Sequence, residues 1–193
     1  MLSGRRLDLL DPSPFDVEIE DIAHGLARVA RWNGQTVGDH AYSVAEHCVL
    51  VESLVRKLEP SVTASDRLAA LLHDAPEYVL GDMISPVKSA LGPEYSALEK
   101  RLEAAVYLRF GLPPHPTSAL KRTMKRADRI SAYFEAVQIA GFEPDEAKKF
   151  FGTPPAAMRL KLKPLPAVEA QEAFLDRFHK LAAAKARAER QGA

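Results

Sequence analysis

An adjacent histidine and aspartate, His73 and Asp74, stand at the end of a nearly continuous apolar run, in the stretch LLHDAPE over residues 71–77. Burying a carboxylate in an apolar environment is costly unless the group is paired or coordinated. Two polar side chains at the end of a buried helix therefore need a partner. A divalent cation meets that need, because it accepts both imidazole and carboxylate ligands. The pair indicates part of a metal site.

Two further ligand-type residues, His47 and Asp128, stand on other segments with a helical pattern. If three helices bring them to His73 and Asp74, the result is a site with two imidazoles, two carboxylates and open positions for water. The alternative is that His47 caps a helix or packs in the core, and that Asp128 pairs with a neighbouring arginine on the surface. Spacing alone leaves both interpretations open.

The elements that must position these residues are all predicted to be helices. Apolar residues recur at intervals of three and four, and no alternating pattern is long enough to indicate a strand. Ser43 is the expected N-cap of the helix that carries His47, since Glu46 follows three residues later as in a capping box. We expect helices over residues 20–32, 44–58, 65–72, 94–110, 116–139, 144–151 and 167–189, with a short helical turn restarting at Pro76.

These elements predict one all-α domain, a bundle of about six to eight helices, because 193 residues is the length of a single domain. We expect an N-terminal extended segment over residues 1–19 and a core over 20–150. An irregular segment and a helix over 151–193 should pack on that core, with a frayed end. Glycine and proline punctuate residues 81–93, which we expect to be a loop-rich stretch.

The composition excludes several classes of protein. Hydrophobic residues make up 47% and charged residues 27%, which is typical of a globular domain. Lys+Arg and Asp+Glu both number 26, so the chain lacks the basic surplus of nucleic-acid binders, and we expect no nucleic-acid partner. No apolar run approaches a membrane span and no signal peptide is evident, which predicts a cytoplasmic protein without a membrane partner. The single cysteine, Cys48, excludes a disulfide framework and a cysteine-based zinc site.

A basic cluster occupies residues 121–129, on the same predicted helix as Asp128. Its members are Lys121, Arg122, Lys125, Arg126 and Arg129. We interpret it as the solvated face of a helix, some of whose residues line a mouth for an anionic substrate.

The order of His47, the His73-Asp74 pair and Asp128 resembles the H…HD…D signature of the HD-domain metal-dependent phosphohydrolases. The surrounding motifs resemble those of the bacterial 5′-deoxynucleotidases within that superfamily. They are RW at residues 31–32, SVAEH at 43–47, HDAPE at 73–77, GD at 81–82 and SPVK at 85–88. An isolated HD pair is weakly specific, whereas HDAPE followed by GD and SPVK is a strong match. The resemblance covers roughly residues 20–140 and implies an all-α, HD-type helical bundle.

The resemblance implies a role for each matching residue. The implied metal ligands are His47, His73, Asp74 and Asp128. Glu77 takes the position of a carboxylate in acid–base chemistry, and Asp82 that of a second acidic residue near the leaving group or the sugar. Arg31 and Trp32 take positions that contact the nucleotide and help to select deoxyribose. The implied cofactor is a divalent ion of Co, Mn, Mg, Zn, Ni or Fe, and the sequence does not define which.

The leading hypothesis is a metal-dependent phosphomonoesterase that removes phosphate from nucleoside 5′-monophosphates, with 2′-deoxy sugars expected. One alternative is an HD hydrolase that acts on a different nucleotide or phosphoester. Another is a non-catalytic module that binds a nucleotide or a metal for regulation. The presence of Glu77 and Asp82 beside all four implied ligands favours an enzyme. The expected partner is a small nucleotide substrate, and the resemblance makes a homodimer plausible.

Overall fold

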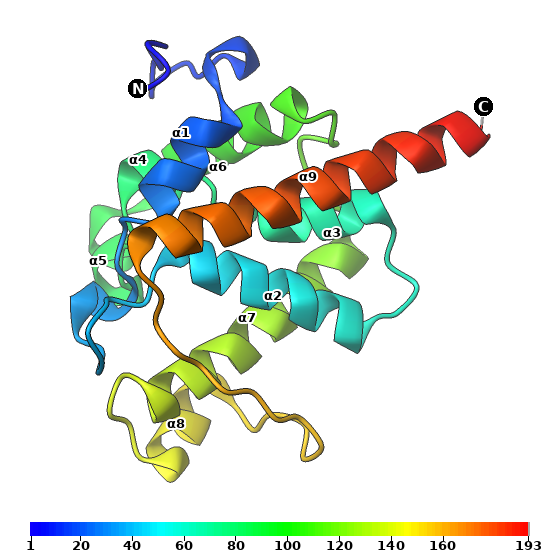
Figure 1. Cartoon of the computed structure of the whole chain (residues 1–193). Helices are drawn as coiled ribbons and strands as arrows, with labels where there is room; N and C mark the ends of the chain where they lie inside the picture. The colour runs from blue at the N-terminus through cyan, green and yellow to red at the C-terminus, as the bar shows by residue number, and fades with distance from the viewer. Residues whose placement is uncertain (193) are drawn as a thin grey trace.

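The computed structural model describes residues 1–192, and this part of the chain is helical (Figure 1). Its nine α-helices are α1 (Ile19–Leu26), α2 (Val44–Leu58), α3 (Ala64–Leu71), α4 (Glu77–Leu80), α5 (Ser85–Leu91), α6 (Pro93–Arg109), α7 (Ser118–Gln138), α8 (Pro144–Phe151) and α9 (Ala167–Gly192). Two 3₁₀-helices are also present, η1 (Pro14–Asp16) and η2 (Arg31–Gly34). Residues 1–192 form no β-strand beyond one isolated bridge between Ala30 and Ser43, which confirms the all-α fold class.

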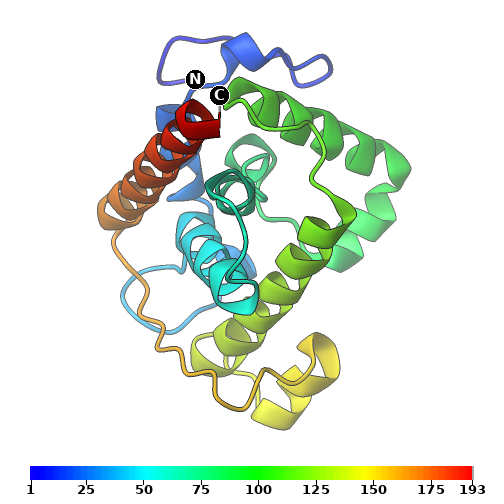
Figure 2. The ribbon, with the colours of Figure 1, turned by 90° about the vertical axis from the view of Figure 1, so that its right-hand side faces the viewer.

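Helix α2 lies at the centre of the bundle and packs against α3, α7 and α9. Figure 2 shows α9 and α7 on either side of it. Its inward face is apolar, and burial of each such side chain stabilises the fold by about 1.5–3 kcal/mol. The fully buried members of this part of the core include Val51, Leu54, Val55, Leu68, Leu71 and Phe174.

A buried carboxylate also joins three of these helices. Glu52 of α2 is fully buried and accepts hydrogen bonds from Arg67, which stands on α3, and from Arg177 on α9. Because an unpaired charge at this position would be costly, the two arginines fix how α3 and α9 sit on α2.

The N-terminus of α2 is fixed as the sequence predicts. The backbone N–H of Glu46 donates to Ser43 Oγ over 3.3 Å, and the N–H of Ser43 donates to Glu46 Oε2 over 2.9 Å. This reciprocal pair is a capping box. It places His47 at a defined point in the first turn of the helix.

The structure corrects two predicted elements. Helix α1 ends at Leu26 rather than near residue 32, and residues 31–34 form the separate 3₁₀-helix η2. There Trp32 and Asn33 have φ of 56° and 52°, a left-handed conformation that cannot continue an α-helix. The predicted loop over residues 81–93 contains helix α5, because Pro86 stands in its first turn, where proline is tolerated, rather than breaking it.

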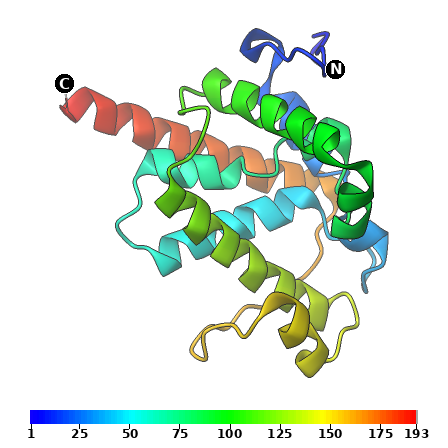
Figure 3. The same ribbon diagram turned by 180° about the vertical axis from the view of Figure 1, so that it is seen from behind.

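The C-terminal helix α9 continues to Gly192, beyond its expected end at residue 189. An ion pair of 2.7 Å between Lys185 and Glu189, one helical turn apart, supports this last part. Seen from behind, α7 crosses the molecule between α6 and α8 (Figure 3). No helix within residues 1–192 has the length and apolarity that crossing a bilayer requires.

Helices α1 and α4 approach each other closely at Gly25. A Cβ atom on this residue would lie 2.8 Å from Tyr78 Cβ and 2.9 Å from the carbonyl oxygen of Tyr78. Tyr78 follows Glu77 directly, so this contact sets the position of the segment that carries Glu77.

We expect Gly25→Ala to lower the free energy of unfolding by about 1–3 kcal/mol, because the added methyl group forces α1 away from α4. Urea denaturation followed by circular dichroism measures this change. Glu20→Ala, at an exposed position on the same helix, should stay within about 0.5 kcal/mol of the wild type. An unchanged midpoint for Gly25→Ala would mean that the two helices separate without cost.

Candidate metal centre and cleft

The four predicted metal ligands come together in the structure. His47 lies in the first turn of α2, His73 and Asp74 lie in the turn after α3, and Asp128 lies midway along α7. His47 Nε2 is 3.4 Å from Asp74 Oδ2 and 3.3 Å from Asp128 Oδ1, and His73 Nε2 is 3.2 Å from Asp74 Oδ2. Two imidazoles and two carboxylates from three segments therefore surround one point.

Both histidines direct Nε2 toward that point. His47 Nδ1 lies 2.6 Å from Glu135 Oε1, and His73 Nδ1 lies 3.0 Å from the carbonyl oxygen of Ala70. Because these oxygens accept hydrogen bonds, each Nδ1 carries a hydrogen, so a ring that gives up its other proton to bind a metal has its lone pair on Nε2. Both Nε2 atoms are buried without a hydrogen-bond partner. Such orphaned nitrogens beside carboxylates fit a divalent metal ion.

The electrostatics of the cluster favour a cation. Burial alone would lower the pKa of His73, but the Asp74 carboxylate outweighs it and raises that pKa well above the usual value. Burial would raise the pKa of Asp74, but the positive charge that His73 and His47 can carry lowers it well below the usual value. The carboxylates thus create a strongly negative potential where the ring nitrogens converge, which a divalent cation would satisfy.

A buried carboxylate on α7, Glu135, connects this cluster to Arg31 and Trp32. Its Oε1 accepts hydrogen bonds from His47 Nδ1 and, over 2.7 Å, from Ser131 Oγ. Its Oε2 accepts from Arg31 Nε and Nη2 over 3.2 and 3.0 Å, and from Trp32 Nε1 over 2.9 Å. Burial would raise the pKa of Glu135, but Arg31 and His47 lower it far below the usual value, so the group is a carboxylate.

Glu135 and Ser131 are the residues that the sequence analysis missed. A signal for them exists in the sequence. Asp128, Ser131 and Glu135 follow one another at intervals of three and four, which puts three polar groups on one face of α7. The same face contains Met124 and turns toward the core.

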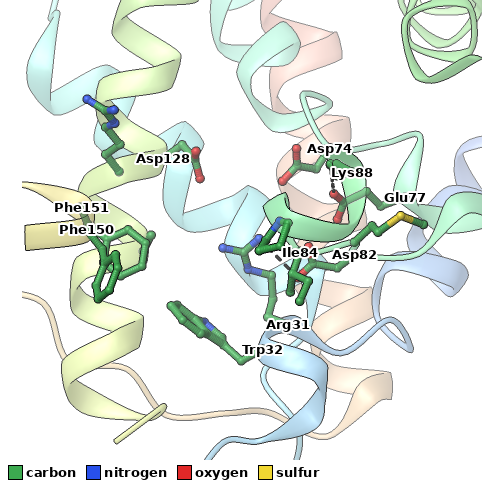
Figure 4. A pocket seen from close by; sticks show the side chains of 14 residues that line it. Arg31, Trp32, Asp74, Glu77, Asp82, Ile84, Lys88, Asp128, Phe150 and Phe151 are labelled. Atoms are coloured by element: carbon green, nitrogen blue, oxygen red, sulfur yellow. Dashed lines mark hydrogen bonds and ion pairs between the residues drawn. The ribbon is translucent and has the colours of Figure 1, made fainter. Parts of the chain in front are cut away.

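A cleft of about 580 Å³ opens onto the cluster (Figure 4). This volume falls in the range of small-molecule sites. The cleft is lined by Asp74 and Asp128 and by all four residues that the resemblance assigns to chemistry or substrate binding, Arg31, Trp32, Glu77 and Asp82. Other parts of its wall are Met83, Ile84, Pro86, Lys88, Arg129, Ala132, Phe150 and Phe151.

Glu77 stands in the first turn of α4 and is almost fully buried. Burial, and after it the carboxylates of Asp74 and Asp82, raise the pKa of Glu77 to about 8. Its Oε2 has no hydrogen-bond partner, and Lys88 Nζ lies 3.5 Å from its Oε1. A carboxyl group in this setting can hold a proton at neutral pH and deliver it to a neighbouring atom.

Arg31 and Asp82 face each other across the cleft floor, with 3.5 Å between Arg31 Nη1 and Asp82 Oδ2. Gly81, at φ 76°, ends α4 in a conformation that favours glycine and turns the chain toward Arg31. The guanidinium donates its Nε and Nη2 hydrogens to Glu135, so only its Nη1 edge remains for a ligand. Arg31 therefore holds the carboxylates of Glu135 and Asp82 in place and also faces the cleft.

Trp32 is held on two sides. Its Nε1 donates to Glu135, and its ring centroid lies 5.6 Å from that of Phe142 and 5.8 Å from that of Phe151. Its left-handed backbone is costly for a bulky residue and persists only where the surroundings enforce it. Strain of this kind is common at ligand-binding sites.

The buried Cys48 also lies close to the cluster. Its Sγ groups with ligand atoms of His73 and Asp74, all within 4.8 Å of one another. Burial raises the pKa of this thiol, which keeps it neutral, and a neutral thiol is a poor metal ligand.

An all-α fold with two imidazoles and two carboxylates at the floor of a cleft defines a class of helical proteins able to hold a metal ion beside a small ligand. The sequence model of the family described as 5′-deoxynucleotidase YfbR-like matches residues 22–181, and the chain belongs to this family of phosphohydrolases. The match extends beyond residues 20–140, on which the resemblance rested, and includes much of α9.

Two relatives cover nearly the whole chain. The uncharacterized protein RCAP_rcc00048 of Rhodobacter capsulatus is 61% identical over 185 residues, which are 94% of this chain and 93% of the relative. The uncharacterized protein YfdR of Escherichia coli K12 is 32% identical over 166 residues, 86% of this chain and 85% of that protein. Both relatives are uncharacterized, so neither assigns a substrate.

We expect Glu135→Gln to weaken metal binding about 10–100-fold while the helical fold is kept, because the substitution removes the carboxylate that orients His47. Competition with a chelating indicator measures the affinity, and circular dichroism checks the fold. Asp74→Ala should lose the metal altogether, and Glu143→Gln, exposed just before α8, should bind it like the wild type. Equal affinities in Glu135→Gln and wild type would show that Glu135 only buries a charge.

Proposed function

We propose that the protein is a metal-dependent phosphomonoesterase that hydrolyses nucleoside 5′-monophosphates and prefers 2′-deoxy sugars. The observation that carries the proposal is the pair of orphaned, buried Nε2 atoms that face two carboxylates at the floor of a nucleotide-sized cleft. Membership of a family named for 5′-deoxynucleotidases supports the choice of substrate class. The cytoplasmic location and the homodimer stay predictions.

The residues that would hold the metal are His47, His73, Asp74 and Asp128. A bound divalent ion would lower the pKa of a water molecule and offset negative charge on phosphoryl oxygens. Two imidazoles and two carboxylates suit several of the expected ions, so the donor set alone does not select the native metal.

The remaining chemistry belongs to side chains of the cleft. We assign Glu77 as the acid that protonates the leaving 5′-oxygen, because burial and its acidic neighbours raise its pKa to about 8. Arg31 would offer its Nη1 edge to the phosphate, with its orientation set by Glu135 and Asp82. Asp82 would thereby act through Arg31 and lie near the sugar.

The aromatic wall of the cleft suits a nucleoside. Trp32, Phe150 and Phe151 line the side opposite Glu77 and Lys88 (Figure 4). Flat apolar faces of this kind stack on a base or a sugar. The hydrogen bond from Trp32 Nε1 to Glu135 holds the indole ring in place. A ring held in this way would not move aside for a 2′-hydroxyl and so would exclude it.

The experiment that tests the proposal is an assay of phosphate release by the purified chain. Its panel holds deoxynucleoside and ribonucleoside 5′-monophosphates, 3′-monophosphates, cyclic nucleotides and sugar phosphates, each with several divalent metals. Highest kcat/KM on 5′-deoxynucleotides supports the proposal. Highest kcat/KM on another phosphoester favours a different hydrolase of this kind, and binding without turnover favours a regulatory module.

We expect Glu77→Gln to keep the fold and the metal but to lose about 10²–10⁴-fold in kcat, because the amide cannot donate the proton as an acid does. Phosphate release, together with metal content, measures both effects. Glu99→Gln is the matched control, since Glu99 also pairs with Lys88, over 2.9 Å, but lies outside the cleft lining. A wild-type kcat in Glu77→Gln would remove Glu77 from the chemistry.

We expect Trp32→Ala to narrow the preference for deoxynucleotides, because it opens room beside the sugar. A buried 2′-hydroxyl left without a partner costs roughly 1–3 kcal/mol, or about a ten- to hundredfold preference that the variant should lose. The measurement is the ratio of kcat/KM for dAMP and AMP. Trp32→Phe keeps an aromatic face and separates the ring from the lost hydrogen bond to Glu135. If Trp32→Ala retains the wild-type ratio, the indole does not select the sugar.

A further inference from the structure

A second hollow of about 470 Å³ adjoins the metal cleft, and every charged residue that lines it is basic. Its cations stand on α7, and the opposite wall comes from Phe151 and the segment that follows α8. The residues of interest are Arg122, Lys125, Arg126, Arg129, Phe151 and Thr153.

The four cations occupy one face of α7. Positions 125, 126 and 129 follow position 122 by three, four and seven residues, which places all four on one side of a helix. All four are exposed, and among the described residues none of them forms an ion pair. Lysines elsewhere do pair within one turn, as the exposed Lys148 with Asp145 and the partly buried Lys185 with Glu189. Like charges at this spacing repel one another, so an anion bound across this face would stabilise it.

The hollow borders the cleft. Arg129 and Phe151 line both, and Arg129 directly follows Asp128, one of the clustered carboxylates. A ligand whose first phosphate lies at the metal can therefore extend past Phe151 into the hollow. The groups that would meet it there are guanidinium and ammonium donors and the Thr153 hydroxyl, which together suit a phosphate.

We propose that this basic hollow binds a second phosphate group of the nucleotide whose 5′-phosphate lies in the cleft, so that nucleotides with two phosphates are substrates of the protein. The inference rests on the proposed function, which places the first phosphate. A separate phosphate or pyrophosphate ion offers the same chemistry, and the experiment distinguishes the two sources.

The first measurement is kcat/KM of the metal-loaded full chain for deoxythymidine 3′,5′-bisphosphate and for dTMP, at low salt. We expect the bisphosphate to be preferred about tenfold in the wild type, because it adds charge-assisted hydrogen bonds. The combined variant Arg122→Ala and Arg126→Ala should lose this preference. Lys121→Ala removes the same charge from the same helix outside the hollow, and it should keep the wild-type ratio.

The second measurement is calorimetric titration of pyrophosphate into metal-free full chain, which reports on the hollow without any turnover. The proposal is supported if the wild type binds pyrophosphate and prefers the bisphosphate, and if the combined variant loses both properties. If the wild type binds pyrophosphate in the hollow but does not prefer the bisphosphate, the hollow is a site for a free phosphate ligand, and its assignment to the substrate is overturned. Absence of both overturns the hollow as a phosphate site. Failure of the protein to hydrolyse dTMP instead contradicts the proposed function, and the titration still decides whether the hollow binds phosphate.

Discussion

The site depends on one buried carboxylate. Glu135 is fully buried on α7 and is the common partner of His47, Arg31 and Trp32. Without it, His47 would lose the group that fixes its tautomer, and a guanidinium would be buried without its counter-charge. The two halves of the site, the cluster of imidazoles and carboxylates and the part of the cleft wall formed by Arg31 and Trp32, are therefore oriented by opposite oxygens of one side chain. Displacement of α7 would disturb both halves together.

The bundle brings these groups together because α2 packs between elements that are distant in the sequence. His47 on α2 meets the end of α3 on one side and α7 on another, and the Glu52 pairs with Arg67 and Arg177 hold α3 and α9 against the same helix. The cluster of imidazoles and carboxylates lies at the N-terminal end of α2, and Glu52 lies further along the same helix. Charged contacts thus fix the relative positions of helices whose apolar contacts alone allow some sliding.

The sequence predicted the helical class from the spacing of its apolar residues. It predicted the convergence of His47, the His73-Asp74 pair and Asp128 through its resemblance to the HD-domain phosphohydrolases, because residue type and spacing alone left a surface position for Asp128 open. It did not predict Glu135, because a glutamate on an amphipathic helix is usually exposed and only tertiary packing shows that this one is buried. Helix α5 was missed because Pro86 indicates both a loop and a helical first turn. The end of α1 was misplaced because the left-handed conformation of Trp32 is imposed by its tertiary contacts.

The position of Trp32 has a spectroscopic consequence. It is the single tryptophan in the chain, and its indole lines the cleft while its Nε1 contacts Glu135. The intrinsic tryptophan emission of the protein therefore originates entirely from the ligand-facing wall of the site. Occupancy of the cleft, changes in its hydration and loss of the Glu135 contact all alter the surroundings of that one fluorophore, without any added label.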